Sequence, residues 1–104
     1  MSDELKEYRV LVHNDSVDML SAHMKFLANV SIEAANNLYN AFVKNSTSLK
    51  NFPYRCPIYP TRKASLTYRQ LVFSKRYLIV FDIDEEKAVV NINYVLDTRQ
   101  DNDL

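Results

Sequence analysis

The sequence predicts a single α+β domain in which one N-terminal strand precedes a helical hairpin and a three-stranded antiparallel meander. Three observations predict this class. A short alternating segment comes first, two segments with helical apolar spacing follow, and the last third holds three strand-like segments separated by short polar gaps. The length of 104 residues supports one hydrophobic core and is too short for two. We therefore expect residues 1–104 to form one domain, with the helices on one face of a single sheet.

The opening strand is predicted at Tyr8 to His13, where β-branched and aromatic residues are enriched and alternate. Asn14-Asp15-Ser16 then offers N-cap side chains for a helix from about residue 15 to residue 28, with Asp18 in its first turn. Spacings of three and four residues predict the buried stripe of this helix, which consists of Val17, Leu20, Met24 and Leu27.

A second, longer helix is predicted to begin after Ser31, which is its N-cap, with Glu33 in the first turn. It should end around Lys50-Asn51, before Pro53, with a lysine in its last turn. The short break between the two helices favours an antiparallel hairpin. The predicted apolar stripe of the second helix is Ala35, Leu38, Phe42 and Leu49, widened by Tyr39 and Val43.

Three prolines predict an irregular, stiff loop from Pro53 to about Ser65. The meander strands are predicted at Leu66 to Phe73, Tyr77 to Ile83 and Ala88 to Leu96, because the polar gaps between them are short enough for hairpins.

Alternation in the last strand predicts which side chains face the helices. Val90, Ile92, Tyr94 and Leu96 should face them, whereas Asn91 and Asn93 should face away. Continued alternation would place Arg99 on the open side, unless the strand ends before it. The orientation of the strand that carries Arg69 stays open, because Leu71 and Phe73 share a side with that arginine.

The composition argues against several classes of function. Because glycine is absent, a phosphate-cradling loop is not expected, and turns must be made by Asn, Asp, Ser, Pro or Lys. The single cysteine, Cys56, is interpreted as a plain loop or semi-buried thiol, and no His or Cys spacing suggests zinc. We expect no metal and no cofactor. An acidic N-terminus and the lack of a run of 18 apolar residues favour a cytoplasmic protein without a membrane segment.

The charges are unevenly distributed, although the formal net charge is zero. No acidic residue occurs between Glu33 and Asp82, and that stretch carries eight cations: Lys44, Lys50, Arg55, Arg62, Lys63, Arg69, Lys75 and Arg76. Segregation by chance is one interpretation. The other is a basic surface for a polyanion or an acidic partner, in which cations from the middle of the chain gather on one patch.

Four segments in this order resemble the RelE/ParE superfamily of toxins from bacterial type II toxin–antitoxin modules, a group that includes plasmid stabilisation proteins. They are YRVLVH at Tyr8; LKNFP, from Leu49 to Pro53; YRQL at Tyr68 followed by YLIVF at Tyr77; and YVLDTRQD at Tyr94. The resemblance spans nearly the whole chain. It implies a toxin that inhibits growth when it is released from its antitoxin.

Two mechanisms are implied by the resemblance. RelE-like members cleave mRNA on the ribosome, whereas ParE-like members bind DNA gyrase, so whether this chain is an enzyme stays open; if it is one, it is a metal-free endoribonuclease. Arg69 and Arg99 match the family's arginines and are the candidate catalytic residues, in contact with a phosphate or the target. Arg62, Lys63, Lys75 and Arg76 are candidate binding residues.

The sequence departs from the nuclease pattern near its C-terminus, where RelE-like enzymes usually carry a histidine or tyrosine. This chain has neither after Tyr94, which itself is predicted to be in the core, and His13 and His23 are interpreted as structural or surface residues. The two candidate arginines also have a scaffold interpretation, in which they pair with Asp82, Asp97 or Asp101. Two functions of other classes stay open: a non-toxic module of the same fold that captures an acidic peptide, and an RNA-binding domain without catalysis.

Overall fold

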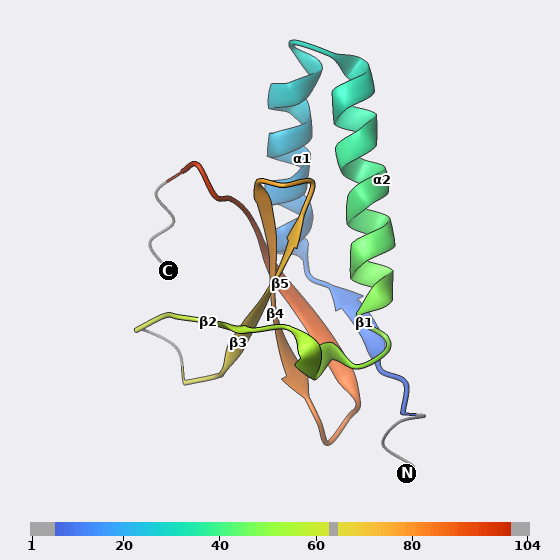
Figure 1. Cartoon of the computed structure of the whole chain (residues 1–104), viewed down its shortest axis with the longest axis vertical. Coiled ribbons are helices and arrows are strands. Elements are labelled where there is room, and N and C mark those ends of the chain that lie inside the picture. The colour runs from blue at the N-terminus through green and yellow to red at the C-terminus, as the bar shows by residue number, and fades with distance from the viewer. Residues whose placement is uncertain (1–5, 63–64, 101–104) are drawn as a thin grey trace.

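The computed structural model describes residues 6–62 and 65–100, and it has the predicted α+β architecture (Figure 1). A helical hairpin and one sheet account for the fold. The helices are α1 (Asn14–Ala28) and α2 (Ile32–Ser48), and a short 3-10 helix, η2, covers Pro53–Arg55. The strands are β1 (Arg9–Val12), β2 (Ile58–Tyr59), β3 (Tyr68–Phe73), β4 (Tyr77–Asp84) and β5 (Val89–Asp97).

The sheet has the order β1-β5-β4-β3-β2. The predicted meander is confirmed, since β3, β4 and β5 pair antiparallel in sequence order. Strand β1 runs parallel to β5, with Val10 opposite Val90, because the helical hairpin carries the chain back before the meander begins. The segment predicted as irregular contains a further short strand, β2, which pairs antiparallel with the start of β3.

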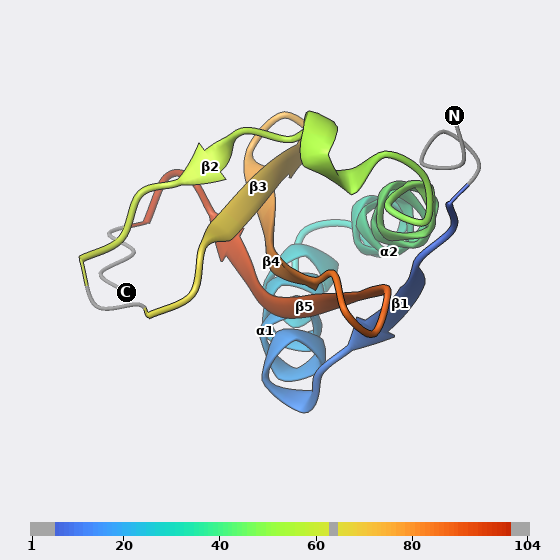
Figure 2. The same ribbon diagram turned by 90° about the horizontal axis from the view of Figure 1, so that it is seen from below.

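The helical hairpin stands on one face of the sheet, and its connection lies far from the β4–β5 turn (Figures 1 and 2). The predicted cap of α2 is confirmed, because Ser31 Oγ accepts a hydrogen bond from the amide of Ala34 at 3.1 Å. The predicted cap of α1 is wrong. His13 is the N-cap and makes no side-chain cap hydrogen bond, since Asn14 is already helical; Ser16 donates its hydroxyl to the His13 carbonyl at 2.6 Å.

The C-terminus of α2 is stabilised from outside the helix. The predicted lysine is not in its last turn, because the helix ends at Ser48. Arg55 supplies the positive charge instead: its guanidinium donates to the carbonyls of Asn51 and Phe52 at 2.7 and 3.1 Å and to Ser48 Oγ at 2.9 Å. Arg55, one of the eight cations of the stretch without acidic residues, therefore binds groups of this chain itself.

The main core lies between the helices and the sheet. The predicted stripe of α2 is buried, as is Leu20 of α1. Val17, predicted in the buried stripe of α1, is 46% exposed, and Tyr39 and Val43, at 48% and 43%, do not widen the buried face of α2 as predicted. The fully buried side chains beneath the hairpin come mainly from β4, β5 and the residue that follows α2; they include Leu49, Ile79, Phe81, Val90, Ile92 and Val95. Burial of these groups supplies the main drive for folding.

A β-bulge at Asn93 changes the orientation of the last strand. Val80 lies opposite Tyr94 and Phe81 lies opposite Ile92, so Asn93 is an extra residue without a partner on β4. Val95 therefore joins Val90 and Ile92 in the main core, whereas Tyr94 and Leu96 pack with Leu78 and Val80 on the opposite face. The prediction that Tyr94 faces the helices is wrong, because one inserted residue reverses the alternation. Leu96 shares the face of Tyr94, yet it still lines a hollow together with Met19 and Ala22 of α1.

Among residues 6–62 and 65–100, four residues adopt left-handed backbone conformations. Ser74 and Lys75 do so in the β3–β4 turn and belong to the residue types predicted for turns, but Ala88 and Phe52 do not. Each costs about 1 kcal/mol relative to a relaxed backbone. Ser74, Lys75 and Ala88 are held in place by the short turns between paired strands, and Phe52 is the N-cap of η2.

Candidate functional site

Three of the predicted site residues lie at one end of the sheet. Lys75 and Arg76 are exposed in the β3–β4 turn, and Arg99 follows directly after β5. Tyr77 is opposite Asp97 in the β4–β5 ladder, and the amide of Thr98 donates to the Arg76 carbonyl at 2.7 Å. The turn and the segment that carries Arg99 are therefore adjacent.

Arg99 is held by Asp97 through a two-point interaction. Its Nε donates to Asp97 Oδ1 at 3.1 Å and a terminal nitrogen donates to Oδ2 at 2.8 Å, while the Arg99 amide donates to Oδ1 at 2.9 Å. Asp97 is only 5% exposed. These hydrogen bonds lower the pKa of the Asp97 carboxyl and raise the pKa of Arg99. The ion pair between Arg99 and Asp97 that the scaffold interpretation predicted is therefore confirmed. About half of the Arg99 side chain nevertheless stays accessible to solvent.

The bulge decides the side on which this pair lies. Because Asn93 reverses the alternation, Val95 and Asp97 point to the helix side, and Arg99 lines a hollow that α1 also lines. The prediction that Arg99 lies on the open side of the sheet is wrong for this reason, and because β5 ends at Asp97.

The hollow between α1 and the end of β5 has a volume of about 440 Å³. It brings an imidazole, a phenol, a carboxylate and a guanidinium to one place, and its lining consists of Ala22, His23, Phe26, Tyr77, Asp97, Arg99 and Gln100. The rings of His23 and Tyr77 meet edge to face with centroids 5.2 Å apart. Phe26, which also lines the hollow, is 66% exposed. We call this the Arg99 hollow.

Sequence reasoning missed His23, Tyr77 and Asp97 as members of a site. His23 is one residue before Met24 and three after Leu20, a spacing that places it beside the buried stripe of α1. That spacing was the available signal. The spacing does not predict which strand His23 contacts, because that contact depends on how α1 packs over β5.

Arg69 lies elsewhere and is used inside the fold. Its guanidinium donates to the carbonyls of Cys56 and Tyr54 at 2.7 and 3.4 Å and sits 5.1 Å from the centre of the Tyr54 ring. Since Arg69 is opposite Phe81, it faces the helix side, whereas Asp82 faces the other side. Arg69 therefore ties the segment after α2 to the sheet, and the proposed pair with Asp82 does not form.

The remaining binding candidates do not all share this end. Arg62 is exposed in the connection between β2 and β3, at the end of β3 remote from Lys75 and Arg76. Lys63 and Asp101 lie outside the described residues. The structure thus brings Lys75, Arg76 and Arg99 together but leaves Arg62 and Arg69 at the opposite end of β3.

The open face of the sheet is not free of carboxylates. Asp82 accepts hydrogen bonds from Asn93 at 2.7 Å and from Asn91 at 3.2 Å, and Asn91 Oδ1 is 2.8 Å from Nε2 of His13. Next to this polar row, Tyr68 and Tyr94 meet edge to face. Asp82 therefore brings a negative charge to this face of the sheet.

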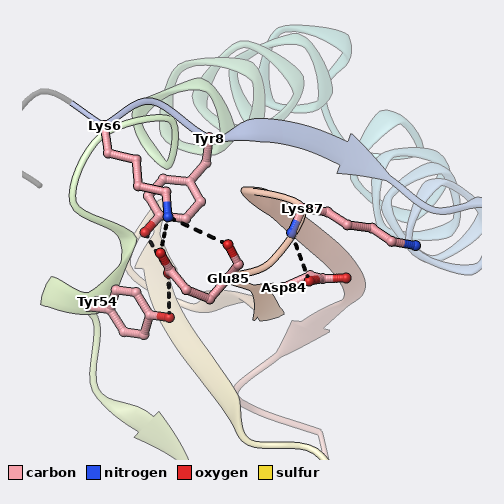
Figure 3. A network of polar contacts seen from close by, with 6 residues as sticks. All are labelled: Lys6, Tyr8, Tyr54, Asp84, Glu85 and Lys87. Atoms are coloured by element: carbon pink, nitrogen blue, oxygen red, sulfur yellow. Dashed lines mark hydrogen bonds and ion pairs between the residues drawn. The ribbon is translucent and has the colours of Figure 1, made fainter.

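A second polar cluster joins three distant segments around Glu85 (Figure 3). Tyr8 and Tyr54 donate their hydroxyls to Glu85 Oε1 at 2.7 and 2.8 Å, and Lys6 forms an ion pair with Oε2. Hydrogen bonds from Lys6, Tyr8 and Tyr54 lower the pKa of Glu85 to about 2. We call these four residues the Glu85 clamp. They line one side of a hollow of about 630 Å³ that also includes Phe52, Pro53 and Arg55.

Within the described ranges, no group of three or more His, Cys, Asp or Glu side chains is arranged to hold a metal ion. Cys56 is buried, and burial raises the pKa of its thiol. In the same part of the chain, neither helix has the length and apolar character needed to cross a membrane.

The fold has a solved counterpart. The chain is similar to a chain of the toxin–antitoxin complex RelBE2 from Mycobacterium tuberculosis, with a TM-score of 0.57 and 19% sequence identity over 88% of this chain and 98% of that one. No family model and no curated protein matches the sequence. The RelE-like fold predicted from the sequence is therefore confirmed, and at this level of identity the likeness concerns the fold.

Proposed function

We propose that this chain is the growth-inhibiting toxin of a bacterial type II toxin–antitoxin module, and that it acts in the cytoplasm by cleaving mRNA engaged on the ribosome. Two kinds of observation support the proposal. The fold is shared with a chain of a toxin–antitoxin complex. The Arg99 hollow holds the kinds of side chain that cleavage of a phosphodiester next to a 2′-hydroxyl requires.

The observation that carries the proposal is the pair of hydrogen bonds from the Arg99 guanidinium to the buried Asp97 carboxylate at the side of the hollow. The carboxylate orients the guanidinium and leaves part of it open to solvent, which suits an oxyanion that gains charge in the transition state. Lys75 and Arg76 in the adjacent turn add phosphate contacts that weaken as salt rises. Tyr77 offers a hydroxyl for the leaving 5′ oxygen.

The partner that restrains this toxin is an antitoxin with acidic and aliphatic side chains. Such a segment complements the exposed cations Lys75, Arg76 and Arg99 next to exposed Phe26. Its association should slow as salt rises, because steering by charge is screened.

A specific observation also favours a second candidate function, which is gyrase binding. Arg69, one of the two arginines matched to the family, is used to bind backbone carbonyls, which is a scaffold role. A toxin that acts by protein contact needs no phosphate-binding arginine at that position.

Induced expression in a bacterial host, with and without the neighbouring small gene, tests the toxin proposal. We expect growth to stop, mRNA to be cut within translated regions, and the neighbouring gene to restore growth. Arrest with intact mRNA and loss of supercoiling would instead support gyrase binding. Unimpaired growth would contradict the toxin proposal and favour the acidic-peptide module.

A further inference from the structure

His23 is fixed in one orientation by the edge of the sheet. Its Nε2 lies 2.9 Å from the carbonyl oxygen of Val95. That carbonyl belongs to the part of β5 beyond the pairing with β1, which ends at Ile92. A carbonyl oxygen only accepts hydrogen bonds, so Nε2 must carry the proton of the neutral ring. The lone pair of the neutral imidazole is therefore on Nδ1.

The other groups that line the Arg99 hollow leave His23 as its proton acceptor near neutral pH. The Asp97 carboxylate is engaged at both oxygens by Arg99, and an arginine keeps its proton under all ordinary conditions. A tyrosine hydroxyl such as that of Tyr77 is a donor there. Helix α2 contributes no residue to the lining of this hollow. A histidine exchanges its proton within the physiological range.

We propose that His23 is the general base of the RNA cleavage, a role that rests on the proposed function. Nδ1 of His23 takes the proton of the 2′-hydroxyl, and the 2′ oxygen forms a bond to phosphorus while the bond from phosphorus to the 5′ oxygen breaks. The leaving oxygen takes a proton from Tyr77, and solvent then returns a proton to the phenolate and removes one from the imidazolium. The products are a 2′,3′-cyclic phosphate and a free 5′-hydroxyl.

The substitution His23→Gln separates catalysis from structure. The glutamine amide nitrogen can replace Nε2 as the donor to the Val95 carbonyl, but the side chain has no group that accepts a proton near neutral pH. His13→Gln is the matched control. His13 is exposed and contacts Asn91 on the opposite face of the sheet, so the same chemical change there should leave cleavage unchanged.

The experiment measures the cleavage rate of mRNA on ribosomes in a reconstituted translation reaction between pH 5 and pH 9, with thermal unfolding of each variant measured in parallel. We expect wild type and His13→Gln to share a rate that rises with pH and then levels off. His23→Gln should unfold as wild type does, cleave about 10²- to 10⁴-fold more slowly, and lose the rising limb.

Two results would overturn the inference. If His23→Gln keeps the wild-type rate and pH profile, His23 is not the base, although the proposed RNA cleavage stands. If wild type does not cut mRNA under conditions in which it stops growth, the base assignment fails together with the nuclease function. A slower His23→Gln with an unchanged pH profile would show that the histidine only supports the strand edge, which also overturns it.

Discussion

The Glu85 clamp and the Arg99 hollow are both built around one carboxylate, but they use it in opposite ways. In the clamp the carboxylate lies exposed in the β4–β5 turn, and donors from the N-terminal segment and from the segment after α2 bind both of its oxygens (Figure 3). In the hollow the carboxylate is buried, and its cationic partner Arg99 stays half exposed. In the clamp the charges of Lys6 and Glu85 neutralise each other, whereas in the hollow the Arg99 guanidinium stays partly open to solvent.

This difference teaches how scaffold clusters are distinguished from candidate sites. A cluster whose donors and acceptors satisfy one another, as at Glu85, has little capacity left for a ligand. A cluster in which a buried anion orients an accessible cation keeps that capacity, and at Arg99 it does so beside an imidazole with a free lone pair. Arg55 and Arg69 belong with the clamp in this respect, because backbone carbonyls bind their guanidinium groups.

The largest expected effect is at the hollow. Arg99→Ala should reduce mRNA cleavage by about 10²- to 10³-fold, because it removes a donor aimed at the developing negative charge. The cleavage rate on ribosomes measures this, and induced growth arrest should be lost in parallel. Arg55→Ala is a suitable control, since that guanidinium caps α2 and should change stability only. An Arg99→Ala protein that cleaves at the wild-type rate would remove this arginine from the site.

A second prediction concerns the acid stability that Glu85 confers. Its pKa falls from 4.5 in the unfolded chain to about 2 in the fold, so its contribution is complete above about pH 4.5 and is lost as the pH falls toward 2. Glu85→Gln should flatten this part of the stability profile, as measured by chemical denaturation at a series of pH values. Glu86→Gln, in the same turn, is the control. Identical profiles for Glu85→Gln and wild type would mean that the clamp does not form.

The smallest expected effect is that of Tyr54→Phe. The substitution removes the hydroxyl that donates to Glu85 but keeps the ring beneath Arg69, so it should lower the free energy of unfolding by less than about 1 kcal/mol. Thermal unfolding measures the change, and mRNA cleavage should be unaffected. Reduced cleavage in this variant with unchanged stability would move the functional surface from the Arg99 hollow to the hollow beside the clamp.

Local patterns were sufficient to predict most elements of the fold. The apolar spacing of α2, its Ser31 cap and the polar gaps between the meander strands depend on neighbours within a few residues, and each was predicted correctly. The short strand β2 was not predicted, because it exists only by pairing with β3. The candidate site was predicted at Arg99 but without its neighbours, which come from a helix and two strands.

By itself, the sequence determined the class of the fold and the order of its elements, because helical and strand periodicities are set by residues close together in the chain. The tertiary structure decided which cations bind backbone carbonyls and which stay available. The carbonyls that Arg69 binds belong to residues 13 and 15 positions away, and those that Arg55 binds lie in the segment that follows the end of α2. It also decided the side on which Arg99 lies, through one extra residue at Asn93 that only strand pairing reveals. A bulge leaves the sequence pattern intact while it reverses every side chain that follows.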